Sequence, residues 1–230
     1  SVPPGEPDGV RDAKRNLRAW ITHLKENGFT SPSAASSDRS VPSEWRRATA
    51  AKREEWFAFL HDRLATPLLL DPVWRCPVLT QPAAIGIVRE FADRHGAIKV
   101  FDAGDVQANG FQIVQDEDER QTVNDTGASY MGFAASALLS GALSSRDMRY
   151  IFAFSGDGSF TMNPQILIDA VEHGARGCIV IFDNRRMAAI TALQKDQYGV
   201  EYKTNDHVAI DYVALAGAVD GVHALSGGTS

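Results

Sequence analysis

Cysteine is scarce in this chain, which has two cysteines among its 230 residues, Cys76 and Cys178. Two cysteines so far apart in sequence exclude a disulfide framework and a Cys-x-x-Cys metal site. Long hydrophobic runs are lacking too, since none approaches the roughly 20 residues that a membrane-spanning helix needs. The polar N-terminal stretch does not resemble a signal peptide, so the cytoplasm is the expected compartment.

Basic residues are fewer than acidic ones. The chain has 29 acidic and 23 basic residues, a net charge of -6, and no cluster of Lys and Arg. This balance argues against nucleic acid or an anionic membrane as a partner. The hydrophobic content of 44% is ordinary for a globular protein and sufficient for a buried core.

The pattern of the chain changes near residue 79. Before it we expect a helix around residues 17–24, a linker at 30–42, and a helix that Ser43 caps and in which Trp56, Leu60 and Leu64 form one stripe. After it, helical and strand patterns alternate, which is typical of a doubly wound parallel α/β sheet. We therefore predict a helical extension over 1–78 and a main domain over 79–230. The expected helices are 82–95, 131–143, 164–174 and 210–218, and the expected strands are 98–102, 150–154, 178–182 and 222–225.

Two polar clusters follow two of these strands. One strand runs into Ser155-Gly156-Asp157-Gly158, a helical pattern comes next, and the strand at 178–182 then ends at Asp183-Asn184. In a right-handed parallel crossover the ends of the two strands are neighbours. The sequence therefore places both clusters at one edge of the sheet.

The chemistry of these clusters suits a hard cation beside a phosphate. Asp157 offers a carboxylate oxygen, Asn184 an amide oxygen and Arg186 a backbone carbonyl, and Mg2+ takes such ligands together with phosphate oxygens and water. Gly156 and Gly158 permit close approach of the backbone, and the helix that follows offers free amides to an anion. A diphosphate held by Mg2+ is the predicted ligand. The alternative is structural, with Asp157 in a surface turn and Asn184 at a helix start.

Gly-Asp-Gly followed by Asp-Asn after one helix and one strand resembles the fingerprint of thiamine diphosphate-dependent enzymes related to acetolactate synthase, whose usual ending is Asn-Asn. The resemblance covers roughly 82–230 and implies the thiamine diphosphate-binding fold. It implies thiamine diphosphate and Mg2+ as cofactors. It also implies metal ligands at Asp157, Asn184 and Arg186, and cofactor contacts at Gly156, Gly158, Ser159, Phe160, Met187 and Ala188.

Two further segments are similar to that family. The stretch 127–134 contains Met131, which the resemblance identifies as the residue that wedges the cofactor into its bent conformation, and Ser129, whose carbonyl would accept from the aminopyrimidine. A core methionine is the alternative for Met131. Gly104-Asp105-Val106 stands where many members have Gly-Gln-His as a second diphosphate contact. Because a carboxylate repels a diphosphate, either Asp105 points away while backbone amides bind, or it meets the substrate.

The resemblance covers only the diphosphate-binding half of such enzymes. The family's pyrimidine-binding domain carries the glutamate that activates the cofactor, and no segment here resembles it. We therefore expect a split enzyme or a piece of a longer one, active with a partner chain that carries the pyrimidine-binding domain. Self-association into an assembly of two copies of each chain is expected, with a small carbonyl compound as substrate.

Within the family, Phe182-Asp183-Asn184 and Tyr130-Met131-Gly132-Phe133 resemble the cyclic 1,2-dione acylhydrolases. This implies cleavage or formation of a carbon-carbon bond next to a carbonyl, with hydrolysis of a cyclic 1,2-dione as one form. An acetolactate synthase-like carboligase or a 2-oxoacid decarboxylase half stays open, as does a non-catalytic binding subunit. A 2-oxoacid oxidoreductase subunit is disfavoured because iron-sulfur transfer needs cysteine clusters.

Overall fold

The computed structural model describes residues 21–23, 26, 43–71, 74–116, 121–144, 149–205 and 208–228. The chain divides into two compact units, Ser1–Lys52 and Arg53–Ser230. The predicted helix at 17–24 lies largely outside the described residues, and the predicted linker at 30–42 lies wholly outside them. The domain boundary that we place after residue 78 stays a prediction.

Helix α2 (Ser43–Ala65) crosses the boundary between the two units and begins at Ser43, the residue that we predicted as its cap. Only part of its predicted stripe is in the core. Leu60 is buried and Leu64 packs against the same cluster, whereas Trp56 is 43% exposed. The helix leads into an antiparallel hairpin of β1 (Leu68–Leu70) and β2 (Pro77–Leu79), which the sequence did not predict.

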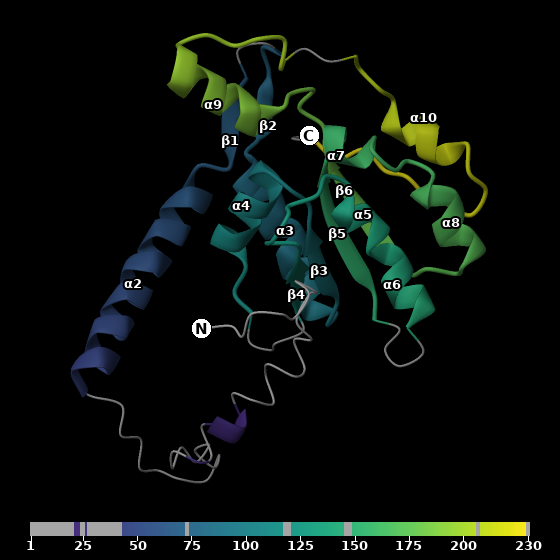
Figure 1. Ribbon diagram of the computed structural model, residues 1–230. Coiled ribbons are helices and arrows are strands. Elements are labelled where there is room, and N and C mark those ends of the chain that lie inside the picture. Colours follow the sequence, from purple (N-terminus) through teal and green to yellow (C-terminus); the bar gives the residue numbers. More distant parts are fainter. Residues whose placement is uncertain are drawn as a thin grey trace, which may run out of the picture. The chain divides into compact units, whose positions relative to one another are not determined.

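Four parallel strands form the main sheet in the order β4-β3-β5-β6 (Figure 1). This confirms the predicted doubly wound parallel α/β fold. The strands are β3 (Ile98–Phe101), β4 (Thr122–Asn124), β5 (Ile151–Gly156) and β6 (Gly177–Phe182). The strand predicted at 222–225 is wrong, because residues 222–228 pair with no strand. Leu225 is 96% exposed there, and the Ser-Gly-Gly that follows disfavours extended pairing.

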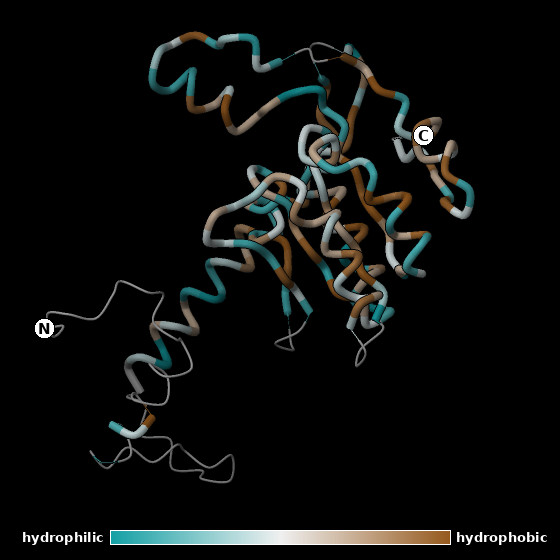
Figure 2. The backbone as a smooth tube through the Cα atoms, turned by 45° about the vertical axis from the view of Figure 1, so that its right-hand side comes forward, coloured by the Kyte–Doolittle hydropathy of each residue, from teal (hydrophilic) through white to brown (hydrophobic). Residues whose placement is uncertain are grey.

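Helices cover both faces of the sheet, and the side chains of each strand alternate between them. Phe101 and Phe154 stack with ring centroids 4.6 Å apart in the cluster on one face, to which α2, α3 (Gln81–Arg94) and α4 (Asp105–Ile113) contribute. Ile151 and Ala153 face the other way, toward α5 (Phe133–Ser136) and α6 (Leu138–Leu143), two short helices where one was predicted. The hydrophobic stretches of the chain gather around the sheet (Figure 2).

Helix α4 packs closely against β3. A Cβ on Gly110 would lie 2.5 Å from the Phe101 ring, so only glycine lets α4 lie this close to β3. The sequence predicted neither α4 nor α9 (Ala188–Tyr198). The remaining helices are α7 (Asp157–Phe160), α8 (Ile166–Glu172) and α10 (Tyr212–Gly217). Of the helices in the described ranges, none is long and apolar enough to cross a membrane.

The strand order creates a crevice at one end of the sheet. From β3 the chain moves to β4 on one side and then crosses to β5 on the other. At such a switch point the connections leave the carboxyl ends of the two central strands in opposite directions, and ligands of open α/β sheets bind there. The exits of β3 and β5 are therefore the place to look for a functional site.

Candidate functional site

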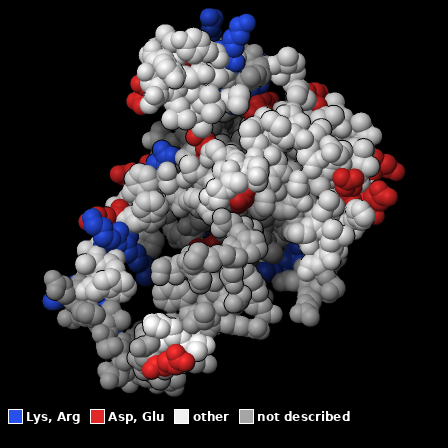
Figure 3. Space-filling view, viewed as in Figure 1, with Lys and Arg blue, Asp and Glu red and all other residues white. Residues whose placement is uncertain are grey.

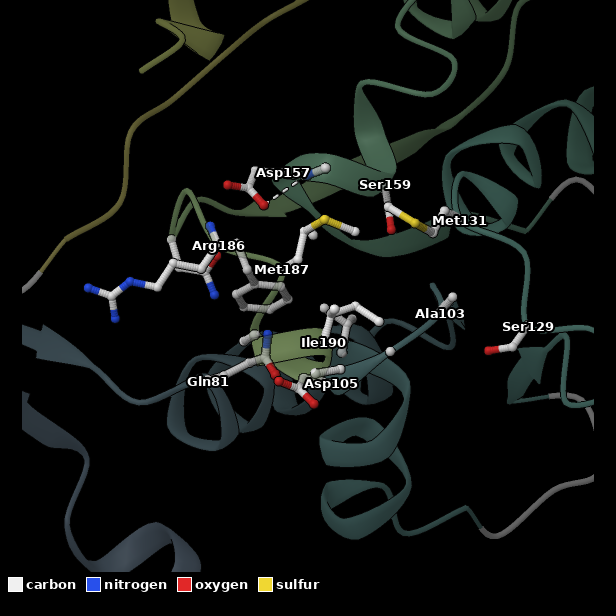
Figure 4. Close-up of a pocket in the computed structure, with 18 residues that line it drawn as sticks. Gln81, Ala103, Asp105, Ser129, Met131, Asp157, Ser159, Arg186, Met187 and Ile190 are labelled. Atoms are coloured by element: carbon white, nitrogen blue, oxygen red, sulfur yellow. Dashed lines mark hydrogen bonds between the residues drawn. The ribbon is translucent and has the colours of Figure 1, made fainter. Parts of the chain in front are cut away.

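A cavity of about 270 Å³ lies at these carboxyl ends (Figure 4). Its walls come from the exit of β3, the segment before α5, the turn after β5 and the loop after β6. The structure brings together all but one of the residues predicted from the sequence. These are Gly104, Asp105, Val106, Ser129, Met131, Gly156, Asp157, Gly158, Ser159, Asn184, Arg186, Met187 and Ala188.

Phe160 is the exception. Its side chain is 2% exposed and packs with Ala135 and Ile166 in the core, with its ring edge-on to Tyr212 at 5.8 Å. Helix α7 is a single turn, so its fourth residue points back toward the sheet while its first residues face the cavity. The Phe160 side chain therefore points away from any ligand in this cavity.

Asp157 is held by two backbone amides. Its Oδ1 accepts from the Gly158 amide at 2.8 Å (Figure 4), and its Oδ2 accepts from the Arg185 amide at 2.6 Å. Arg185 has a φ of 52°, a left-handed conformation that points its amide toward the turn after β5. The Oδ1 of Asn184 accepts from the Arg186 amide at 2.9 Å. The two side chains predicted to bind metal thus stand on adjoining, hydrogen-bonded turns.

Negative charge accumulates at this edge. Burial raises the pKa of Asp183, and the neighbouring charge of Asp157 raises it further, against the opposing charge of Arg185. Burial, followed by the charges of Asp157 and Asp183, raises the pKa of Tyr212 to about 12. Part of each shift comes from a neighbouring negative charge, and a divalent cation here would be stabilised by the same charges.

The loop after β6 is anchored by the β1–β2 hairpin. The Arg186 Nη1 lies 3.6 Å from Asp71 Oδ2, and the Arg185 guanidinium lies over the Trp74 ring at 5.0 Å from its centroid. The same arginines donate their backbone amides to the predicted metal ligands. The hairpin therefore helps to fix the conformation of the loop, which a motif search around Asp157 could not show.

Met131 reaches over the turn after β5. It is 38% exposed, and its methyl carbon lies 3.5 Å from where a Cβ on Gly158 would stand. Ser129 has a φ of 56°, in the turn that leads to it. This places Met131 at the cavity rather than in the core, which fits a wedge, and that role stays a prediction.

A buried carboxylate that the sequence did not single out supports this segment. Asp102 is fully buried, and its Oδ1 accepts from the Gly132 amide at 2.9 Å while its Oδ2 accepts from Ser155 Oγ at 2.9 Å. It also accepts from the Ala103 amide at 2.9 Å. Asp102 therefore ties the exit of β3 to β5 and to the segment that carries Met131.

The exit of β3 becomes the N-terminus of α4. Gly104 is the residue before the helix and has a φ of 81°, which glycine adopts without strain. Asp105 lies in the first turn, where a carboxylate is favoured by the helix dipole. Both line the cavity, so a ligand there meets free backbone amides as well as a carboxylate.

These groups match a metal-bound diphosphate. Carboxylate, carboxamide and carbonyl oxygens are the ligands that Mg2+ prefers, and the glycine-lined turns bring backbone amides to the cavity. No group of three or more His, Cys, Asp or Glu residues that could hold a metal occurs in the described part of the chain. The predicted set needs none, because it has one carboxylate and two neutral oxygens.

The sequence model of one family matches residues 102–228, and that family is described as "Thiamine pyrophosphate enzyme, C-terminal TPP binding domain". Thiamine pyrophosphate is another name for thiamine diphosphate. The matched range begins at Asp102 and runs through both polar clusters of the cavity.

Curated relatives share a name. The 3D-(3,5/4)-trihydroxycyclohexane-1,2-dione hydrolase of Clostridium perfringens is 27% identical over 190 residues, covering 80% of this chain and 29% of the relative. The hydrolase of that name from Bacillus subtilis is 33% identical over 96 residues, covering 39% of this chain and 15% of the relative. The matches thus span less than a third of the length of these relatives.

A solved structure with a similar fold is the thiamine diphosphate-dependent 4-hydroxybenzoylformate decarboxylase of Rhodococcus jostii RHA1. It is 23% identical with a TM-score of 0.54, and the match covers 61% of this chain and 26% of the decarboxylase. At this identity the likeness supports the fold alone.

Proposed function

Because the chain belongs to the thiamine pyrophosphate enzymes, matching their C-terminal TPP binding domain, we propose that it grips the diphosphate end of thiamine diphosphate through one Mg2+. The observation that carries the proposal is the arrangement of Asp157 and Asn184. Their side chains stand on two adjoining turns at the edge of one cavity, and burial followed by nearby negative charge raises the pKa values of Asp183 and Tyr212 beside them.

Each residue has a defined part in this proposal. The carboxylate of Asp157, the amide oxygen of Asn184 and the carbonyl of Arg186 hold Mg2+. The backbone around Gly156, Gly158 and Ser159, and that of 104–106, receives the diphosphate, with Met187 and Ala188 closing the side near α9. When bound, thiamine diphosphate supplies a carbon nucleophile and an electron sink. Met131 sets the conformation of the cofactor, and the Ser129 carbonyl accepts from its aminopyrimidine.

The reaction that we propose cleaves or forms a carbon-carbon bond next to a carbonyl, with hydrolysis of a cyclic 1,2-dione as its form. The name that the curated relatives share and the similar Phe182-Asp183-Asn184 ending support this choice. A carboligase or a 2-oxoacid decarboxylase is the second candidate, since the family contains carbon-carbon chemistry of several kinds.

We propose that a pyrimidine-binding domain with the activating glutamate completes the site, either on a partner chain or on further sequence of a longer polypeptide. The cavity of about 270 Å³ lies below the range of about 300–1,000 Å³ usual for small-molecule sites, which suits a site that has a second wall. Two copies of each chain would assemble in the cytoplasm. On the face in Figure 3, charges of both signs are scattered in small groups, which fits a protein partner better than a nucleic acid.

Calorimetry tests the central part of this proposal. Thiamine diphosphate should bind with Mg2+ present and much more weakly with a chelator, and thiamine without phosphates should bind weakly in both. Equal affinity for thiamine and thiamine diphosphate would contradict a diphosphate site. Turnover of the trihydroxycyclohexane-1,2-dione against 2-oxoacids, measured with the pyrimidine domain supplied, then separates the two candidate reactions.

A further inference from the structure

Three polar side chains form a relay that ends at the cavity. Arg63 of α2 donates through Nη2 to Asn109 Oδ1 at 2.6 Å, and Asn109 of α4 donates through Nδ2 to Gln81 Oε1 at 2.6 Å. All three side chains are partly buried, and Gln81 lines the cavity from the first residue of α3. Neither the fingerprint nor the mechanism proposed above uses any of them.

The chemistry of the relay fixes which end of Gln81 faces the cavity. A guanidinium has only donors, so the atom of Asn109 that meets Arg63 must be its oxygen. The nitrogen of Asn109 then faces Gln81, and there only an acceptor can meet it. The Gln81 oxygen is thereby directed to α4 and its nitrogen is directed into the cavity, as Figure 4 shows. The donors of Arg63 therefore determine the orientation of both side-chain amides.

The positive charge of Arg63 also acts on the cavity through these hydrogen bonds. Arg63 forms no ion pair among the described residues, its Nε is buried without a hydrogen-bond partner, and its guanidinium lies 6.0 Å from the Phe59 ring centroid. A charge that pairs with no described carboxylate polarises the hydrogen-bonded amides in line with it. The Gln81 N–H groups are stronger donors as a result.

We infer that Gln81 binds the diphosphate, donating from Nε2 to one of its oxygens, and that Asn109 and Arg63 are positioning residues that hold the donor in place. This inference rests on the proposed function. A diphosphate offers only acceptor oxygens, and Gln81 presents N–H groups for which the described residues provide no acceptor. Gln81 also shares the cavity wall with Asp105, so its donor offsets the repulsion that this carboxylate exerts on an anion.

Substitutions at Gln81 test the contact itself. Binding of inorganic diphosphate and of thiamine diphosphate, each with Mg2+, is measured by calorimetry on the full chain. Gln81→Met keeps the shape and removes the donors, so both affinities should fall about tenfold, the scale of a hydrogen bond to a charged group. Gln81→Glu puts an acceptor in the cavity and should cost about a hundredfold or more. Binding of thiamine, which has no phosphate, should not change.

A remote substitution tests the relay. In Asn109→Asp, residue 109 has acceptors only, so one oxygen keeps Arg63 and the other draws the nitrogen of Gln81 away from the cavity. The affinity for diphosphate should fall about as far as in Gln81→Met, although no residue of the cavity has changed. Ala108→Glu, on the exposed neighbouring residue of α4 and outside the cavity lining, controls for the added charge and should bind as the wild type does.

The double variant shows whether Asn109→Asp acts by turning the Gln81 amide or by a general effect on the structure. If Asn109→Asp acts only by turning Gln81, it should cost nothing further in the Gln81→Met background. Circular dichroism and thermal melts confirm that each variant is folded. Wild-type affinity in Gln81→Met, or an undiminished cost of Asn109→Asp in that background, overturns this inference while the proposed function stands. If the wild-type chain binds neither inorganic diphosphate nor thiamine diphosphate, both this inference and the proposed function are overturned.

Discussion

Replacing Asp157 by Asn separates metal binding from folding. The substitution keeps the shape but leaves one of the two amides that Asp157 satisfies, from Gly158 and Arg185, without its acceptor. An unmade hydrogen bond of this kind costs about 1–3 kcal/mol. The change also removes the negative charge that raises the pKa of Asp183, which is a gain of opposite sign. We expect the melting temperature without metal to move by no more than a few degrees.

Metal binding should respond far more strongly. At an effective dielectric constant of about 20, two unit charges about 4 Å apart interact by about 4 kcal/mol, and the interaction with a divalent ion is twice as large. The amide oxygen of the new Asn, or a water molecule, recovers part of this energy. A net loss of at least about 3 kcal/mol, more than a hundredfold in the affinity for Mg2+, is the expected result.

Thermal melts with and without ligand measure both effects in one experiment. At a ligand concentration of about 100 times Kd, the wild type gains about 2.7 kcal/mol, or roughly 5–10 °C for a chain of this size. Asp157→Asn should lose the stabilisation by Mg2+ and thiamine diphosphate, whereas the exposed control Asp220→Asn should keep it. A full ligand-induced shift in Asp157→Asn would refute the assignment of the metal site.

Three further predictions follow from contacts at the site. In the complex with a pyrimidine-binding domain that we propose, Met131→Leu should keep most of the activity and Met131→Gly should lose most of it with diphosphate binding intact, so full activity of the Gly variant would assign Met131 to packing. Asp71→Asn should raise the rate of tryptic cleavage after Arg186 several-fold and cost at most about 1 kcal/mol, and an unchanged rate would mean that the hairpin does not hold the loop. Because the pKa of Tyr212 is raised to about 12 from 10.0, the stability that its neutral phenol contributes is present below pH 10 and is lost between pH 10 and 12. In a spectrophotometric titration, Tyr212→Phe should therefore remove a component near pH 12, and loss of one near pH 10 would contradict this origin.

The strands that could be predicted from the sequence are those with a short run of apolar residues. β3, β5 and β6 are short apolar runs and were placed within two residues of their observed ends. β4 is an edge strand of three residues, Thr122–Asn124, with little apolar signal, and it was missed. Helix α4 was missed for a different reason. Its start at Gly104-Asp105 has the composition of a loop, and the helix is fixed by contact of Gly110 with the Phe101 ring.

The residues of the candidate site also divide into those that the sequence could predict and those that it could not. Residues that come directly after a strand, such as Asp157 and Asn184, were predicted because the topology of parallel sheets brings strand ends together. Gln81 was not predicted, because it begins a helix that precedes the main sheet in the chain, and its role depends on Asn109, 28 residues away. Asn109 in turn depends on Arg63, 46 residues from it. Local spacing has no information about contacts of this range.

The two walls of the cavity have opposite electrostatic character. On the side of β5 and β6, Asp157 lies beside Asp183, and burial followed by the charge of Asp157 raises the pKa of Asp183, which favours a cation. On the side of α3 and α4, Gln81 presents donors backed by Arg63, which favours an anion. A diphosphate alone would satisfy only the second wall, and a metal ion alone only the first. A ligand that carries both charges satisfies the two walls at once, so we expect Mg2+ and diphosphate to bind cooperatively, each raising the affinity for the other by the same factor.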